Sequence, residues 1–157
     1  MFVKEVMTTQ VITVSPKNTL SELIALLQES NCHLLPVIDD DNKVMGVINY
    51  KDIMKLFVPH NPALERLLKS SHHYRFEEED ILHTELPAET GKNVRVGDLM
   101  NKNVVSVDEN MTIAEVRHSM KMHNLVRMPV TSDEKLVGFV TLFDIIVALF
   151  RGKGLIE

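Results

Sequence analysis

Apolar residues form short runs along this chain, and the same order of runs occurs twice. Extended segments are predicted at residues 11–14 and 104–107. A helix follows each of them and is predicted to begin after Thr19 or Thr112. Each threonine precedes a glutamate by three residues, a capping-box pattern that satisfies free backbone donors at a helix start. In the first copy the apolar helix face is formed by Leu20, Leu23, Ile24 and Leu27.

A β-hairpin and a second helix are predicted after each of these helices. Polar, turn-forming residues separate two apolar runs in both copies, which is typical of a hairpin. The four strands are expected at residues 34–38, 43–48, 127–131 and 136–140. The second helices start near Tyr50 and Leu142. The repeating unit is therefore strand, helix, strand, strand, helix.

An internal duplication relates the two copies. From Val3 to Pro36 the second copy follows the first without a gap, at a constant offset of 93 residues. Each copy has about fifty residues, which is small for independent stability, so the two are expected to fold as one body. The predicted division is 1–57 for the first repeat, 58–94 for a connecting insertion and 95–157 for the second repeat.

Composition narrows the class of protein. The 157 residues are 45% hydrophobic and 25% charged, which is ordinary for a globular protein. A net charge of −5 without a basic stripe argues against a nucleic-acid partner. Asp144 interrupts the longest apolar segment, so no membrane span is expected. A single cysteine, Cys32, excludes a disulfide framework, and a cytoplasmic location is expected.

The connecting insertion holds four of the seven histidines and an acidic run at residues 77–80. A connection of this length is unusual within a compact domain, and it is either a linker or an elaboration with its own role. His72, His73, Glu77 and His83 do not form a tight ligand motif. No metal site is therefore predicted.

Four short motifs recur in the same order in both copies. With h for an apolar residue, they are Val-x-x-h-Met, Thr-h-x-Glu, h-Pro-Val and Gly-h-h-x-x-x-Asp-Ile. Together they resemble the cystathionine-β-synthase (CBS) domain, and the chain resembles a stand-alone tandem pair of such domains. The resemblance implies an α/β (α+β) fold in which two β-α-β-β-α repeats pack about a pseudo-twofold axis.

The resemblance also implies two clefts between the repeats that take adenosine-containing ligands. Family members bind AMP, ADP, ATP, S-adenosylmethionine, NAD or cyclic diadenylate there. The family's nucleotide signature, Gly-h-x-Thr/Ser-x-x-Asp, is complete at residues 138–144, whereas Asn49 replaces the hydroxyl residue at 46–52. An aspartate in this position can accept hydrogen bonds from both ribose hydroxyls. The same residues also match a helix cap, and the pattern alone does not decide between cap and ligand site.

Carried onto this chain, the family pattern predicts the composition of both clefts. In the first cleft, Thr141 and Asp144 would face Thr8, Val11, Thr13, Cys32, His33 and Leu34. In the second cleft, Asn49 and Asp52 would face Asn101, Val104, Ser106, Val126 and Arg127. Arg127 precedes a proline by two residues, where a guanidinium could hold a phosphate by paired hydrogen bonds. The alternative for Arg127 is an ion pair with the acidic surface.

Two functions from different classes are consistent with these residues. The first is a regulatory sensor that binds an adenine nucleotide as regulatory ligand, requires no cofactor and acts on a separate protein. The alternative is a ligand-free dimerisation module, whose interface would be the apolar second helices at 53–57 and 145–150. A homodimer is expected from the family in either case. An enzyme is not expected, because the motifs provide no set of nucleophile, base and oxyanion donor.

Overall fold

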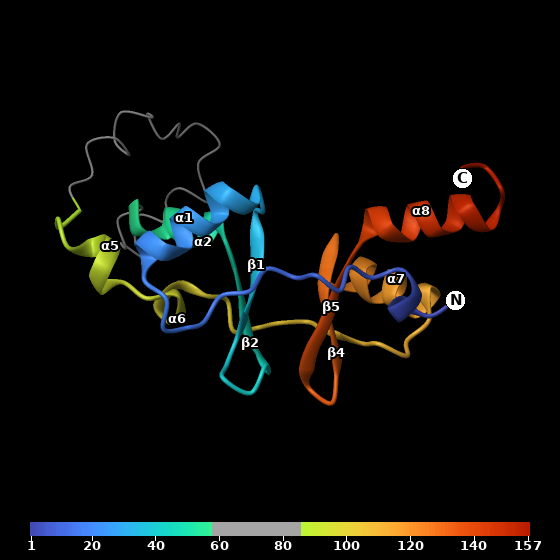
Figure 1. The fold of residues 1–157 in the computed structure, drawn as a ribbon, viewed down its shortest axis with the longest axis horizontal. Coiled ribbons are helices and arrows are strands. Elements are labelled where there is room, and N and C mark those ends of the chain that lie inside the picture. Colours follow the sequence, from blue (N-terminus) through green and yellow to red (C-terminus); the bar gives the residue numbers. More distant parts are fainter. Residues whose placement is uncertain (58–85) are drawn as a thin grey trace, which may run out of the picture.

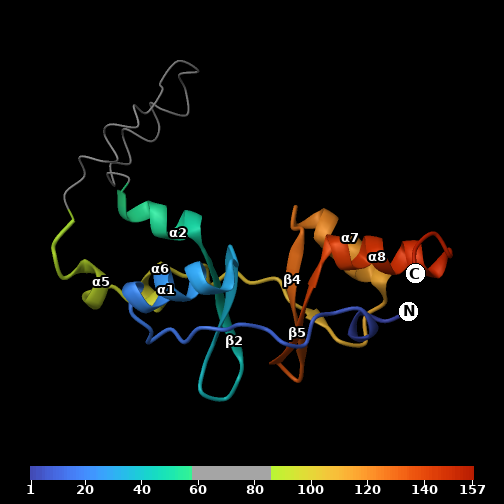
Figure 2. The same cartoon turned by 45° about the horizontal axis from the view of Figure 1, so that its top comes forward.

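The computed structural model describes residues 1–57 and 86–157. They form two lobes, and the two β-hairpins lie next to each other in the middle with helices at the outer ends (Figures 1 and 2). The first lobe contains α1 (Leu20–Ser30), β1 (Leu34–Ile38), β2 (Val44–Asn49), α2 (Tyr50–Met54), the 3₁₀ helix η2 (Lys55–Phe57), α5 (Thr90–Asn93) and α6 (Val96–Leu99). The second contains the 3₁₀ helix η1 (Val3–Glu5), β3 (Val107–Asp108), α7 (Ile113–Met122), β4 (Arg127–Ser132), β5 (Lys135–Thr141) and α8 (Leu142–Gly152).

The hairpins confirm the predicted strands to within one residue at each end. β1 pairs antiparallel with β2, and β4 pairs antiparallel with β5, each with a register shift near the turn. The early extended segments differ from the prediction. Residues 11–14 form only a single bridge, from Val14 to Val37, and β3 has two residues, paired parallel to β4. Both segments lead from one lobe to the other, so only their ends lie beside a strand (Figure 1).

Both predicted capping boxes are present. The Thr19 hydroxyl accepts a hydrogen bond from the Glu22 amide, and the Glu22 carboxylate accepts one from the Thr19 amide at 2.7 Å. Thr112 and Glu115 repeat this arrangement in α7. The Thr19 amide donates to the Glu22 carboxylate, and the Thr112 hydroxyl and amide both donate to the Glu115 carboxylate. These bonds favour the ionised forms and lower the pKa values of Glu22 and Glu115 from their ordinary value of 4.5.

The two lobes exchange their first segments. Val3 precedes the first repeat's helix but is fully buried in the hydrophobic core around α7 and α8. Val96 precedes the second repeat's helix and is fully buried in the core around α1, β1 and β2. Reciprocal backbone hydrogen bonds continue the exchange: Thr8 pairs with Phe139 of β5, and Asn101 pairs with Val47 of β2. Neither core is complete without a segment that belongs, in sequence, to the other repeat.

A direct contact also joins the two hairpin turns. The Leu136 amide donates a hydrogen bond to the Asn42 carbonyl, and the Asn42 side-chain amide donates one to the Leu136 carbonyl, both at 2.9 Å. Beside them, the Lys43 ammonium lies 2.8 Å from the Glu134 carboxylate. This ion pair raises the pKa of Lys43 and lowers that of Glu134. The lobes are therefore joined by the exchanged segments and by their turns.

Among the described residues, no helix has the length and apolar character needed to span a membrane. The histidine and acidic residues of the insertion considered above, 72–83, lie outside the described residues.

Candidate functional site

A cavity of about 220 Å³ lies between the two repeats. Its walls come from the extended segment before α1, from β1, and from the two strands of the second hairpin. The lining residues are Thr8, Gln10, Val11, Ile12, Cys32, Leu34, Leu35, Pro36, Arg127, Phe139 and Thr141. Most of these side chains are apolar, and Arg127 supplies the one full positive charge among them.

The structure brings together several of the residues predicted for the first cleft. Thr8, Val11, Cys32, Leu34 and Thr141 all line this cavity. Thr8 reaches it because its backbone pairs with Phe139 of β5, next to Gly138. Cys32 is a half-buried free thiol that forms part of the wall.

The family pattern predicts Arg127 in the second cleft, whereas in the structure it lines the cavity that contains Thr141. The reason is the register of the second hairpin, in which Arg127 stands directly opposite Thr141. Residues that face each other across an antiparallel pair project to the same side of the sheet. Arg127 therefore shares a cavity with the threonine of its own repeat.

Other predicted residues of the first cleft lie elsewhere. Thr13 and His33 do not line the 220 Å³ cavity. His33 is exposed, and its ring meets the edge of Tyr50 with centroids 5.8 Å apart. Gln10 and Phe139 are lining residues that the sequence analysis missed. Phe139 could have been found, because it occupies the apolar position after the glycine of the nucleotide signature.

Thr141 and Asp144 form the cap of α8. The Asp144 carboxylate accepts hydrogen bonds from the Thr141 amide at 2.7 Å and from the Thr141 hydroxyl at 2.8 Å. Asp144 does not line the same cavity as Thr141. It lines a second cavity of about 450 Å³, together with Glu5, Val147 and Arg151 among others. The hydrogen-bonded pair thus lies between a mostly apolar cavity and a charged one.

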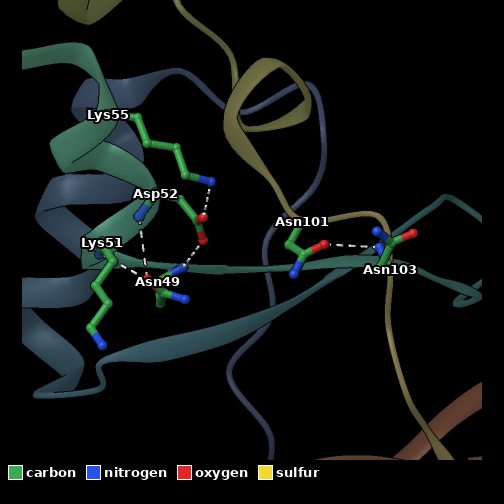
Figure 3. Close-up of polar contacts among 6 residues, drawn as sticks. All are labelled: Asn49, Lys51, Asp52, Lys55, Asn101 and Asn103. Atoms are coloured by element: carbon green, nitrogen blue, oxygen red, sulfur yellow. Dashed lines mark hydrogen bonds and ion pairs between the residues drawn. The ribbon is translucent and has the colours of Figure 1, made fainter. Parts of the chain in front are cut away.

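The corresponding pair in the first repeat has different partners (Figure 3). Asn49 caps α2, and its side-chain oxygen accepts hydrogen bonds from the amides of Lys51 and Asp52. One Asp52 oxygen accepts from the Asn49 amide at 3.0 Å, and the other lies 2.7 Å from the Lys55 ammonium. The Asp52 carboxylate is buried by these contacts.

The remaining residues predicted for the second cleft lie along the segment that leads to the second lobe and at the start of β4. Asn101 pairs with β2, and its side chain accepts a hydrogen bond from the Asn103 amide at 2.9 Å (Figure 3). Val104 is half-buried, whereas Ser106 and Val126 are exposed. No group of three or more metal-ligating side chains is assembled in residues 1–57 and 86–157.

Known proteins with a similar sequence or fold identify the family of this architecture. The family model described as the CBS domain matches residues 3–59 and 96–151. The uncharacterized protein MJ1426 of Methanocaldococcus jannaschii is 32% identical, over 95% of this chain and 91% of its own length. A crystal structure of CBSX2 in complex with AMP has a TM-score of 0.69 at 24% identity, covering 97% of this chain and 98% of the other.

A further solved structure is the CBS domain pair of protein MJ0100 in complex with 5′-methylthioadenosine and S-adenosyl-L-methionine. It has a TM-score of 0.64 and 25% identity, and the match covers 98% of both chains. Two matched repeats, a relative above 30% identity and the shared fold agree with one another. The chain belongs to the CBS-domain family and consists of a pair of CBS repeats.

Proposed function

We propose that this protein is a regulatory sensor that binds an adenosine-containing ligand between its two CBS repeats. The observation that carries the proposal is the 220 Å³ cavity, which combines apolar walls from both repeats with the guanidinium of Arg127 and the hydroxyl of Thr141. A mostly apolar pocket with a few convergent polar groups is the usual form of a small-molecule site. The ligands of MJ0100 and CBSX2, all of which contain adenosine, support the same class of ligand.

The cavity suits the base of such a ligand. Its volume is below the range of about 300–1,000 Å³ that is typical of pockets for complete drug-sized molecules. In the proposed complex, the adenine ring packs against Val11, Leu34 and Phe139. The ribose then reaches the Thr141–Asp144 pair, where the carboxylate can exchange its bond to the Thr141 hydroxyl for the ribose hydroxyls. Arg127 is positioned to pair with a phosphate.

The test is thermal unfolding in the presence of AMP, ATP, NAD, S-adenosylmethionine, 5′-methylthioadenosine and cyclic diadenylate. A ligand at 100 times its dissociation constant should stabilise the fold by about 2.7 kcal/mol. Stabilisation by at least one compound is expected. If none of them stabilises the protein at millimolar concentration, the sensor proposal is wrong.

Two variants test the roles of individual residues. Asp144→Ala should weaken adenosine binding, and retained affinity would contradict the ribose role. Arg127→Ala should weaken AMP more than adenosine, because only AMP carries the phosphate. Arg117→Ala, which removes an exposed arginine of α7, is the matched control and should change neither affinity. Equal losses for AMP and adenosine in Arg127→Ala would contradict the phosphate role.

A second candidate function, a dimerisation module, is favoured by the outer face of α8. Phe143, Ile146, Leu149 and Phe150 are 70%, 42%, 48% and 46% exposed. We propose that this face forms a homodimer interface, which is compatible with ligand binding. If light scattering shows a dimer and none of the compounds above binds, the function is dimerisation without a ligand.

The same proposal assigns the protein a regulatory role rather than a catalytic one. Binding would act on a separate protein by favouring one of two conformations, which requires different ligand affinities for the two states. We place this activity in the cytoplasm, where adenine nucleotides are abundant and the free thiol of Cys32 is kept reduced. Turnover of ATP or NAD that is abolished by Asp144→Ala would instead identify an enzyme.

A further inference from the structure

The two aspartates of the repeated signature have different surroundings. Asp52 is only 5% exposed and is the one buried charged side chain in residues 1–57 and 86–157. Its carboxylate holds the Lys55 ammonium at 2.7 Å. The Lys55 side chain as a whole is 66% exposed. Figure 3 shows the carboxylate and the ammonium on the side of α2 that faces the Asn101 segment.

Among the residues that the structure describes, the second repeat has no equivalent ion pair. After the one-residue shift in the turn, Asp52 corresponds to Asp144 and Lys55 corresponds to Val147. The Asp144 carboxylate bonds only to Thr141 among the described residues, and it is half-buried rather than buried. Asp144 and Val147 line the same 450 Å³ cavity. Asp144 is therefore accessible to a solute, whereas Asp52 is paired with Lys55, the residue that caps the C-terminus of α2.

We propose that Lys55 is an internal latch on the second cleft. It occupies the Asp52 oxygen to which a ribose hydroxyl would otherwise donate, so a ligand must displace the ammonium before Asp52 can hold it. The inference rests on the proposed function, because it assumes that these aspartates meet the ribose. It predicts that the first cleft fills before the second.

The latch also selects the chemical class of ligand in the second cleft. Displacement of Lys55 separates an ammonium from a buried carboxylate, which is unfavourable unless the ammonium gains a new anionic partner. A phosphate on the ligand can provide that partner, whereas uncharged adenosine cannot. The second cleft should therefore prefer phosphorylated adenosine ligands to adenosine itself.

The experiment compares adenosine and AMP in calorimetric titrations of Asp144→Ala protein, in which the ribose carboxylate of the first cleft is absent. Adding Lys55→Met should tighten adenosine binding about fivefold, the upper range for a largely exposed ion pair, and should reduce the preference for AMP by at least that factor. Lys51→Met is the matched control, because Lys51 lies on the same helix and points away from Asp52 (Figure 3). It should leave the preference unchanged.

A reciprocal variant keeps the test decisive if Lys55→Met does not fold. Val147→Lys in an Asp52→Ala background transfers the latch to Asp144 and should weaken adenosine about fivefold, with a smaller effect on AMP. The latch proposal is wrong if Lys55→Met and Lys51→Met show the same preference for AMP over adenosine. It is also wrong if Val147→Lys leaves the adenosine affinity unchanged. Neither result affects the proposed function. If neither adenosine nor AMP binds the unmodified protein, the latch proposal is also wrong. The proposed function is overturned only if the thermal unfolding test also finds no stabilisation by any of its six compounds.

Discussion

Gly46 lies in the first hairpin, where the segment at Met100 and Asn101 packs against strand β2. The absence of a side chain at Gly46 allows this close approach. A Cβ atom added to Gly46 would lie 2.9 Å from the Asn101 carbonyl oxygen and 2.9 Å from the Met100 sulfur. The methionine can move, but the carbonyl belongs to a backbone segment that pairs with β2. Val47 donates to Asn101 at 3.0 Å and accepts from it at 2.8 Å. Gly46→Ala must therefore displace this segment from the strand.

The magnitude follows from two contributions. Overpacking of a close contact costs about 1–3 kcal/mol. Weakening the pair of backbone hydrogen bonds adds about 0.5–1.5 kcal/mol for each bond that is lost. A decrease of about 2–4 kcal/mol in the free energy of unfolding is expected, which is a large fraction of the roughly 5–15 kcal/mol that stabilises a typical domain.

The measurement is urea unfolding followed by circular dichroism, with Gly152→Ala as the control. Gly152 ends α8, and a Cβ atom there would meet nothing within 4 Å, so this alanine should be neutral or slightly stabilising. Gly138→Ala in the second repeat should resemble Gly46→Ala, because its Cβ would meet Met7 and the Thr8 carbonyl. If Gly46→Ala and Gly152→Ala unfold at the same urea concentration, the segment does not pack as described.

Three further predictions concern acid, salt and association. The lowered pKa values of Glu22 and Glu115 imply a stabilising contribution that is present above pH 4.5 and lost as pH falls through the folded-state pKa. Replacing both by glutamine should flatten the acid side of the stability profile, and an unchanged slope would contradict this. Lys43→Met should destabilise slightly in low salt and not at all in about 1 M NaCl, where the Debye length is about 3 Å; a salt-independent loss would exclude an ionic contribution. Leu149→Glu should shift the light-scattering mass from dimer to monomer, and a dimer that persists would place the interface elsewhere.

The candidate site shows where sequence reasoning was sufficient and where it was not. The resemblance to the CBS family predicts Thr8 and Thr141 in one cleft, and both line the same cavity in the structure. The family pattern, which combines the aspartate of one repeat with the pre-proline strand of the other, predicts Arg127 in the second cleft. Its position depends on hairpin register, which pairs it with Thr141. Contacts across a hairpin cannot be obtained from the spacing of residues within one motif.

Local patterns determined the elements of this protein. Capping boxes, apolar periodicity and polar turns act over a few residues, so they predicted both hairpins and the helices α1, α2, α7 and α8. They did not predict the short helices η1, α5 and α6. The exchange of Val3 and Val96 between the two cores depends on contacts far apart in the chain. The same is true of the cavity that forms between the repeats. These apolar segments are buried only when both lobes are present. How the two copies combine was therefore decided by the tertiary structure alone.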